Sequence, residues 1–121
     1  MIDANGLAVA PGFIDIHTHS DIPLMVDGGG QSHIQQGVTT NVIGNCGVGA
    51  APISDEMAAG ANARLFEQLG VEWRSMHDYL ALLEERGLSV NVAALVAQGN
   101  VREAVMGYAE GPANAEQLEA M

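Results

Sequence analysis

The chain has 121 residues, with fifteen carboxylates against four arginines and no lysine, and its formal net charge is −11. Because nucleic-acid binding needs clustered cations, this charge argues against a nucleic-acid partner. A single cysteine forms no internal disulfide, which favours a reducing compartment such as the cytoplasm. No apolar run approaches the ~20 residues of a membrane span, and the N-terminus has no signal-peptide pattern.

The first ten residues contain an Asn-Gly turn and a short apolar segment. After a Pro-Gly pair, the sequence predicts a first strand from Phe13 to His19. Side chains alternate between the faces of a strand, so His17 and His19 are expected on one face, where two imidazoles can reach one cation. Taken alone, the two residues fit a metal site and an ordinary pair of hydrogen-bonded histidines equally well.

Residues 21–30 are expected to form a loop, since they contain Pro23 and three consecutive glycines. The spacing of these glycines does not match a phosphate-binding motif. Asp21 has the same parity as the two histidines, and it is a candidate for contacting the substrate or the metal ligands. Residues 31–36 predict a short helix, on which His33 is a solvated residue and not a ligand.

Residues 38–43 are β-branched at five of six positions and predict a second strand. Cys46 follows this strand, 29 positions after His17. That separation is close to the ~30 residues of a βαβ unit. In parallel neighbouring strands, His17, His19 and Cys46 would meet at the carboxyl ends, where α/β proteins place their sites.

A long helical excursion is expected at residues 48–87, with helices that begin near Ser54, cover residues 61–69 and cover residues 75–86. Ser75 and Asp78 match a capping box. The last helix has a buried stripe at helical spacing, formed by Met76, Tyr79, Leu80 and Leu83. Phe66 and Trp73 either line a pocket for an apolar group or pin the excursion to the sheet, and the second interpretation is favoured.

Residues 88–96 predict a third, parallel strand whose apolar character suits cover on both faces. Two further helical segments are expected, at residues 101–106 and 115–121.

Two segments resemble a known family. Residues 10–21 read Ala-Pro-Gly-Phe-Ile-Asp-Ile-His-Thr-His-Ser-Asp, and residues 37–48 read Gly-Val-Thr-Thr-Asn-Val-Ile-Gly-Asn-Cys-Gly-Val. They resemble the amidohydrolase superfamily and, within it, the N-acyl-D-amino-acid deacylases, or D-aminoacylases. The Gly-Asn-Cys-Gly stretch is the narrower signature, since its cysteine replaces the carboxylated lysine of hydantoinase-like relatives. A looser similarity continues from residue 78 to residue 107.

The resemblance implies an α/β fold, in which residues 11–121 form the first two or three βα units of a (β/α)₈ barrel and residues 1–10 end a flanking β-sandwich. A complete barrel needs ~250 residues, so the remaining metal ligands and the catalytic aspartate are expected beyond Met121. Cys46 would hold one tightly bound zinc ion together with histidines from the missing strands, and His17 and His19 would hold a second, weaker metal position. The implied reaction is hydrolysis of the amide bond of a small N-acyl-D-amino acid.

One residue departs from the family pattern, because Gln98 stands where relatives often have a histidine after the third strand. Three other interpretations remain open. The chain could belong to a different amidohydrolase, of the hydantoinase, dihydroorotase or dipeptidase type. It could be a truncated, non-catalytic fragment that binds metal. A redox or nucleophilic role for Cys46 has no support, since no Cys-x-x-Cys is present.

Overall fold

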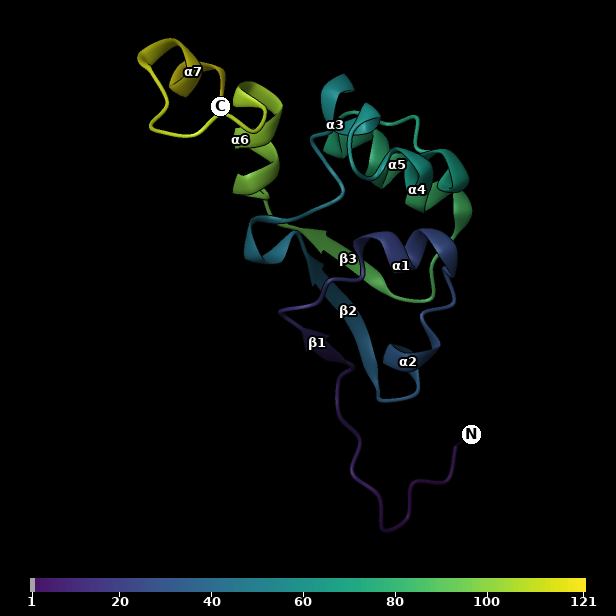
Figure 1. Ribbon diagram of the computed structural model, residues 1–121. Coiled ribbons are helices and arrows are strands. Elements are labelled where there is room, and N and C mark those ends of the chain that lie inside the picture. Colours follow the sequence, from purple (N-terminus) through teal and green to yellow (C-terminus); the bar gives the residue numbers. More distant parts are fainter. Residues whose placement is uncertain (1) are drawn as a thin grey trace.

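The computed structural model describes residues 2–121, and a sheet of three parallel strands lies at its centre (Figure 1). The strands are β1 (Phe13–Asp15), β2 (Val38–Ile43) and β3 (Asn91–Ala94), in the order β1-β2-β3. Both neighbouring pairs are parallel. The parallel arrangement that the spacing of the motifs predicts is therefore confirmed.

Strand β1 is shorter than predicted, because it ends at Asp15 and not at His19. The Asp15 carboxylate accepts a hydrogen bond from the backbone N–H of His17, with an N···O distance of 3.1 Å. An aspartate that accepts from the backbone two residues ahead stabilises a turn in place of the sheet ladder. The prediction that strand alternation places both histidines on one face is therefore wrong, because neither histidine lies in the strand.

Residues 21–30, predicted to be a loop, contain helix α1 (Asp21–Val26). Pro23 lies in the first turn, where backbone N–H groups have no partner within the helix and proline is tolerated. Leu24 and Met25 are buried, so tertiary packing stabilises a helix that is too short to be stable alone. Helix α2 (Gln31–Ile34) follows and is shorter than the predicted 31–36.

Three helices lie between β2 and β3: α3 (Asp55–Ala59), α4 (Ala63–Leu69) and α5 (Met76–Arg86). Both predicted N-caps are confirmed. The Ser54 hydroxyl accepts a hydrogen bond from the Met57 N–H, and the Ser75 hydroxyl accepts one from the Asp78 N–H, both at 3.1 Å. These serines supply acceptors for backbone N–H groups that have no partner inside the helix.

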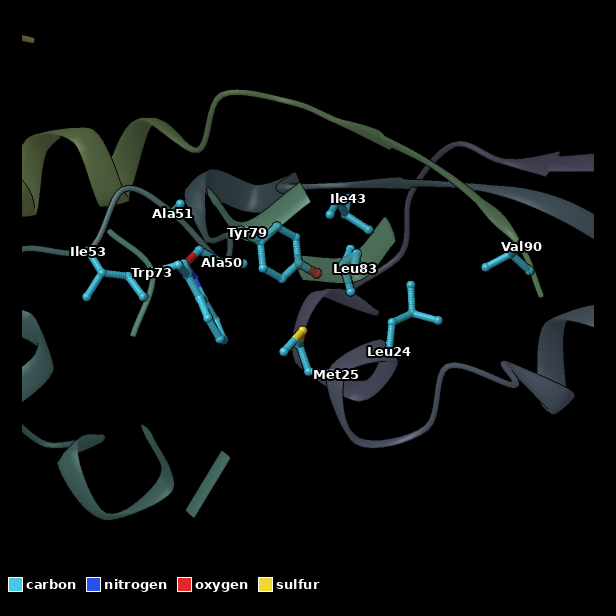
Figure 2. Packing of buried hydrophobic residues seen from close by; sticks show 10 residues of the cluster. All are labelled: Leu24, Met25, Ile43, Ala50, Ala51, Ile53, Trp73, Tyr79, Leu83 and Val90. Carbon is cyan, nitrogen blue, oxygen red and sulfur yellow. The ribbon is translucent and has the colours of Figure 1, made fainter. Parts of the chain in front are cut away.

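The core lies between the sheet and helices α1 and α5 (Figure 2). Helix α5 contributes Tyr79 and Leu83, which confirms the centre of the predicted stripe. The Tyr79 hydroxyl donates to the backbone carbonyl of Asp21 at 2.7 Å, so its polar end is satisfied although the ring is fully buried. Each fully buried apolar side chain contributes roughly 1.5–3 kcal/mol to the free energy of unfolding.

The other face of the sheet is open. The strand register pairs Ile14 with Thr40 and Thr40 with Asn91, so these side chains share that face. Ile14 is 61% exposed, and Asn91 is also exposed. The prediction that β3 is covered on both faces is wrong for residues 2–121, and β3 is shorter than the predicted 88–96.

Helices α6 (Gln98–Met106) and α7 (Ala115–Ala120) follow β3 and extend beyond the carboxyl end of the sheet (Figure 1). Helix α6 begins earlier than the predicted residue 101. Within residues 2–121, no helix is both long enough and apolar enough to cross a lipid bilayer.

Candidate metal centre

The carboxyl ends of β1 and β2 bring three possible metal ligands together. His17 and His19 lie in the segment that follows β1, and Cys46 lies in the short 3₁₀ helix η1 (Asn45–Gly47) that follows β2. The Nε2 atom of His17 is 3.2 Å from the Sγ atom of Cys46. One ligand atom from each of the three side chains lies within 4.8 Å of the other two.

The 3.2 Å distance between His17 and Cys46 fits two ligands of one small cation. Ligand atoms at the usual zinc distances of ~2.0 Å for nitrogen and ~2.3 Å for sulfur lie roughly 3–4 Å apart around a tetrahedral ion. Imidazole and thiolate together are a donor set that suits zinc, since thiolate is a soft ligand. All three side chains are exposed within residues 2–121. The residues present therefore fit a zinc ion.

The backbone around Cys46 is unusual. Cys46 has φ 56° and ψ 24°, and it is the only residue other than glycine with positive φ in residues 2–121. Gly44 and Gly47 on either side also have positive φ. A methyl group built on Gly44 would contact the carbonyl oxygen of Leu95, so the end of β2 lies close against the segment that follows β3. This left-handed turn leaves the Cys46 side chain beside the imidazole of His17.

Two buried asparagines hold the segment that contains Cys46. Asn45 donates from Nδ2 to the carbonyls of Val42 and Thr18. Asn100, on α6, accepts from the Gly49 N–H at 3.1 Å and donates to the Gly49 carbonyl at 2.9 Å. Neither asparagine was predicted from the sequence to be a site residue. Asn45 could have been found from the sequence, since it belongs to the Gly-Asn-Cys-Gly motif. Asn100 could not, because its contacts with Gly49 span 51 positions and no local sequence pattern marks them.

Asp21, the fourth predicted site residue, begins helix α1 and is only 5% exposed. Burial raises the pKa of its carboxyl group above the ordinary value, and hydrogen bonds from the backbone of Asp21, Ala50 and Gly44 oppose that shift without cancelling it. Within residues 2–121, its Oδ1 atom has no hydrogen-bond partner. Asp21 is therefore adjacent to the histidine segment but lies beneath the surface.

A cavity of 320 Å³ lies beside the Cys46 segment, between η1 and helices α3, α4 and α6. Phe66 lines it, together with Gly47 and Asn100. Trp73 does not line this cavity: it is buried and donates from Nε1 to the Ala50 carbonyl at 2.8 Å (Figure 2). The interpretation that Trp73 anchors the excursion is therefore confirmed. Phe66 packs against the core and also lines the cavity, and its contact with an apolar group of a substrate stays a prediction.

The other two histidines lie outside the cluster. His33 is not simply solvated, because its Nε2 atom is 4.0 Å from a carboxylate oxygen of Asp15 and its side chain is 22% exposed. His77 is exposed on α5, as predicted. Gln98 is exposed at the start of α6, and its consequence for metal binding stays a prediction.

The chain is similar to several proteins of known structure or function. The chain is 38% identical over 120 residues to a D-aminoacylase of Alcaligenes xylosoxydans xylosoxydans, covering 99% of this chain and 25% of the relative. A solved structure that describes the binuclear metal centre of D-aminoacylase matches with a TM-score of 0.76 at 36% identity, covering 91% of this chain and 23% of that one. A zinc- and phosphonate-bound N-acyl-D-glutamate deacylase from Bordetella bronchiseptica matches with a TM-score of 0.74, also at 36% identity, covering 91% of this chain and 23% of that one.

The chain thus spans about a quarter of the length of these relatives. Its three parallel strands with their helices are part of the α/β barrel of the superfamily, which confirms the fold expected from the resemblance. The model of the amidohydrolase family matches residues 1–121, and the chain belongs to that family.

Proposed function

We propose that His17, His19 and Cys46 bind zinc in an enzyme that hydrolyses the amide bond of N-acyl-D-amino acids. The observation that carries this proposal is the 3.2 Å distance between His17 Nε2 and Cys46 Sγ, which joins the ends of two neighbouring parallel strands. Further ligands and the catalytic aspartate would come from barrel strands that residues 1–121 do not contain. One ion would be held tightly, and a second more weakly.

The choice of substrate class is supported by the relatives. They include a D-aminoacylase and an N-acyl-D-glutamate deacylase, and the latter was solved with zinc and a phosphonate mimic of the tetrahedral intermediate. The sequence contributes a second argument, since it has a cysteine in a Gly-Asn-Cys-Gly stretch after β2. A small N-acyl amino acid is therefore the proposed partner.

The residues of this chain would act by binding and orienting. A bound zinc ion would polarise the substrate carbonyl and lower the pKa of a water molecule to ~7. His17 and His19 would donate neutral nitrogen lone pairs, and Cys46 would donate as a thiolate. Asp21 keeps its proposed role as a contact of the substrate or of the metal ligands. Its burial supports a contact with the metal ligands.

The domain boundaries follow from the same proposal. Residues 11–121 would form the N-terminal part of the barrel, with the excursion at 48–87 beside the site, and residues 1–10 would end a flanking β-sandwich. The remainder of the barrel would be needed for catalysis. A cytoplasmic location remains the proposal that the single cysteine supports.

A substrate panel on the protein expressed from its own gene tests this function. We expect zinc-dependent release of free amino acid from N-acetyl-D-amino acids, with little from the L-enantiomers and none from cyclic ureides. Opening of the ureides would instead indicate a hydantoinase- or dihydroorotase-like enzyme, and cleavage of dipeptides a dipeptidase-like one. Zinc binding without any hydrolysis would indicate a non-catalytic fragment. A Cys46→Ala variant with full zinc content and full activity would refute the assigned ligand.

A further inference from the structure

One side-chain amide joins the two segments that hold the candidate metal ligands. Asn45 is 8% exposed, and its Nδ2 atom donates to the carbonyl of Val42 at 2.7 Å and to the carbonyl of Thr18 at 3.2 Å. Thr18 lies between His17 and His19, whereas Asn45 immediately precedes Cys46. The amide therefore links the histidine segment to the cysteine segment directly.

The chemistry of these contacts fixes the orientation of the amide. An asparagine NH₂ group has two hydrogens, and both partners of Asn45 are carbonyl oxygens, which can only accept. The Val42 carbonyl also accepts a hydrogen bond from the Thr18 N–H at 3.2 Å, so its two lone pairs are both used. Asn45, Val42 and Thr18 thus form a closed set of hydrogen bonds. No other side-chain type of this size supplies two donors at that position.

The Cys46 side chain depends on this arrangement for its position. Its backbone is in the left-handed region, and the residue is exposed, so packing does not hold it. Asn100 holds the far side of the segment through Gly49, but that contact leads to α6 and not to the histidines. Besides the 3.2 Å approach of His17 Nε2 to Cys46 Sγ itself, the side-chain link to the histidine segment is made by Asn45.

We infer that Asn45 is a positioning residue that holds the Cys46 thiolate within reach of the ion bound by His17 and His19. This inference rests on the proposed metal site. Groups that orient metal ligands typically change metal affinity by ~10–100-fold when they are removed. Loss of the Asn45 amide should therefore weaken metal binding and separate the sulfur ligand from the two imidazoles.

The test compares Asn45→Ala with Asn91→Ala in the protein expressed from its own gene. Asn91 is a matched control, since it also donates from Nδ2 to a backbone carbonyl of β2, that of Thr39, at 3.0 Å, but it does so at the opposite end of the sheet. Two quantities are measured: the zinc dissociation constant by chelator competition, and the thiolate-to-metal charge-transfer absorption of the cobalt-substituted protein. We expect N45A to bind zinc ~10–100-fold more weakly and to lose most of that absorption. N91A should match the unmodified protein.

Two results would overturn the inference: unchanged affinity and absorption in N45A, or an equal loss in N91A. If the unmodified protein bound neither metal, the proposed function would fail, and hydrogen exchange in the metal-free protein would then decide the role of Asn45. Faster exchange of the Thr18 amide in N45A than in N91A would support the link, and equal exchange would refute it. If N45A does not fold, Asn45→Ser keeps one donor and should show an intermediate loss of affinity. Full affinity in N45S would contradict the inference.

Discussion

Cys46 combines a left-handed backbone with a side chain that is proposed to bind metal. For an L-residue with a Cβ atom, this region of backbone conformation is unfavourable by roughly 1–2 kcal/mol, whereas glycine adopts it almost freely. The position is flanked by two glycines with positive φ, so the turn would be easier to form with a third. The retention of a cysteine there is what a functional requirement for the thiol would produce.

This strain predicts an ordering of two variants at residue 46. In metal-free protein, Cys46→Gly should be more stable than Cys46→Ala by about 1 kcal/mol, because glycine removes the unfavourable Cβ interaction. Both should lose zinc binding to the same extent. Chemical denaturation with a shared m-value measures the difference. Gly44→Ala is the converse control and should destabilise, since it adds a methyl group at φ 79° against the Leu95 carbonyl. Equal stability of C46G and C46A would show that the turn is unstrained.

Among the elements, α5 has a capping residue at each end, Ser75 at its start and Gly87 after its last turn. The Ser75 hydroxyl accepts from the Asp78 N–H and donates to the Asp78 carboxylate at 2.6 Å, and Gly87 follows the last turn. The hydrogen bond from Ser75 lowers the pKa of the Asp78 carboxyl below its ordinary value of 3.8. The cap is thus strongest when Asp78 is ionised.

This shift predicts how the stability contributed by Asp78 changes with pH. A carboxyl whose pKa is lower in the folded state stabilises that state above its unfolded pKa, and the contribution is lost as the pH falls through the folded pKa. Asp78→Ala should therefore be less stable than the unmodified protein at neutral pH, and the gap should narrow below about pH 4. Urea denaturation at several pH values measures the gap. Glu85→Ala, on the exposed face of the same helix, should show no comparable narrowing. A gap that is constant with pH would contradict the cap assignment.

At the scale of the whole molecule, metal binding should couple to folding. The candidate ligands lie on segments that follow two different strands, and the unfolded chain does not hold them together. An ion that binds only the folded state stabilises it by ~2.7 kcal/mol at a free concentration 100 times the dissociation constant. The molecule is therefore expected to depend on zinc for part of its stability.

Zinc removal provides the corresponding prediction. Treatment with a chelator should lower the melting temperature by several degrees, and added zinc should restore it. Cys46→Ala should show a much smaller response, because one of the zinc ligands is missing. Calorimetry with and without zinc measures both shifts. Identical melting temperatures for the apo and zinc-loaded protein would show that zinc bound by these residues does not stabilise the fold.

Much of the fold follows from local sequence, since its signals lie within a few residues of one another. The β-branched run of β2 and the Ser75 capping box each depend on near neighbours, and both predictions are confirmed. Helix α1 is different. Its proline and the three glycines after it read as a loop, but the burial of Leu24 and Met25 against the core stabilises a helix. Local patterns cannot show such long-range packing.

The candidate site divides in the same way. The sequence by itself determined which residues could bind metal, because imidazole and thiolate chemistry is a property of the side chains, and it predicted parallel strands whose carboxyl ends bring His17, His19 and Cys46 together. Only the tertiary structure decided how they meet. β1 ends at Asp15, so a turn and not strand alternation orients the histidines. The amide of Asn45 then joins the two segments across 27 positions. Such a contact exists only once the strands have paired, since hydrogen bonds between distant segments depend on the folded geometry and leave no local pattern.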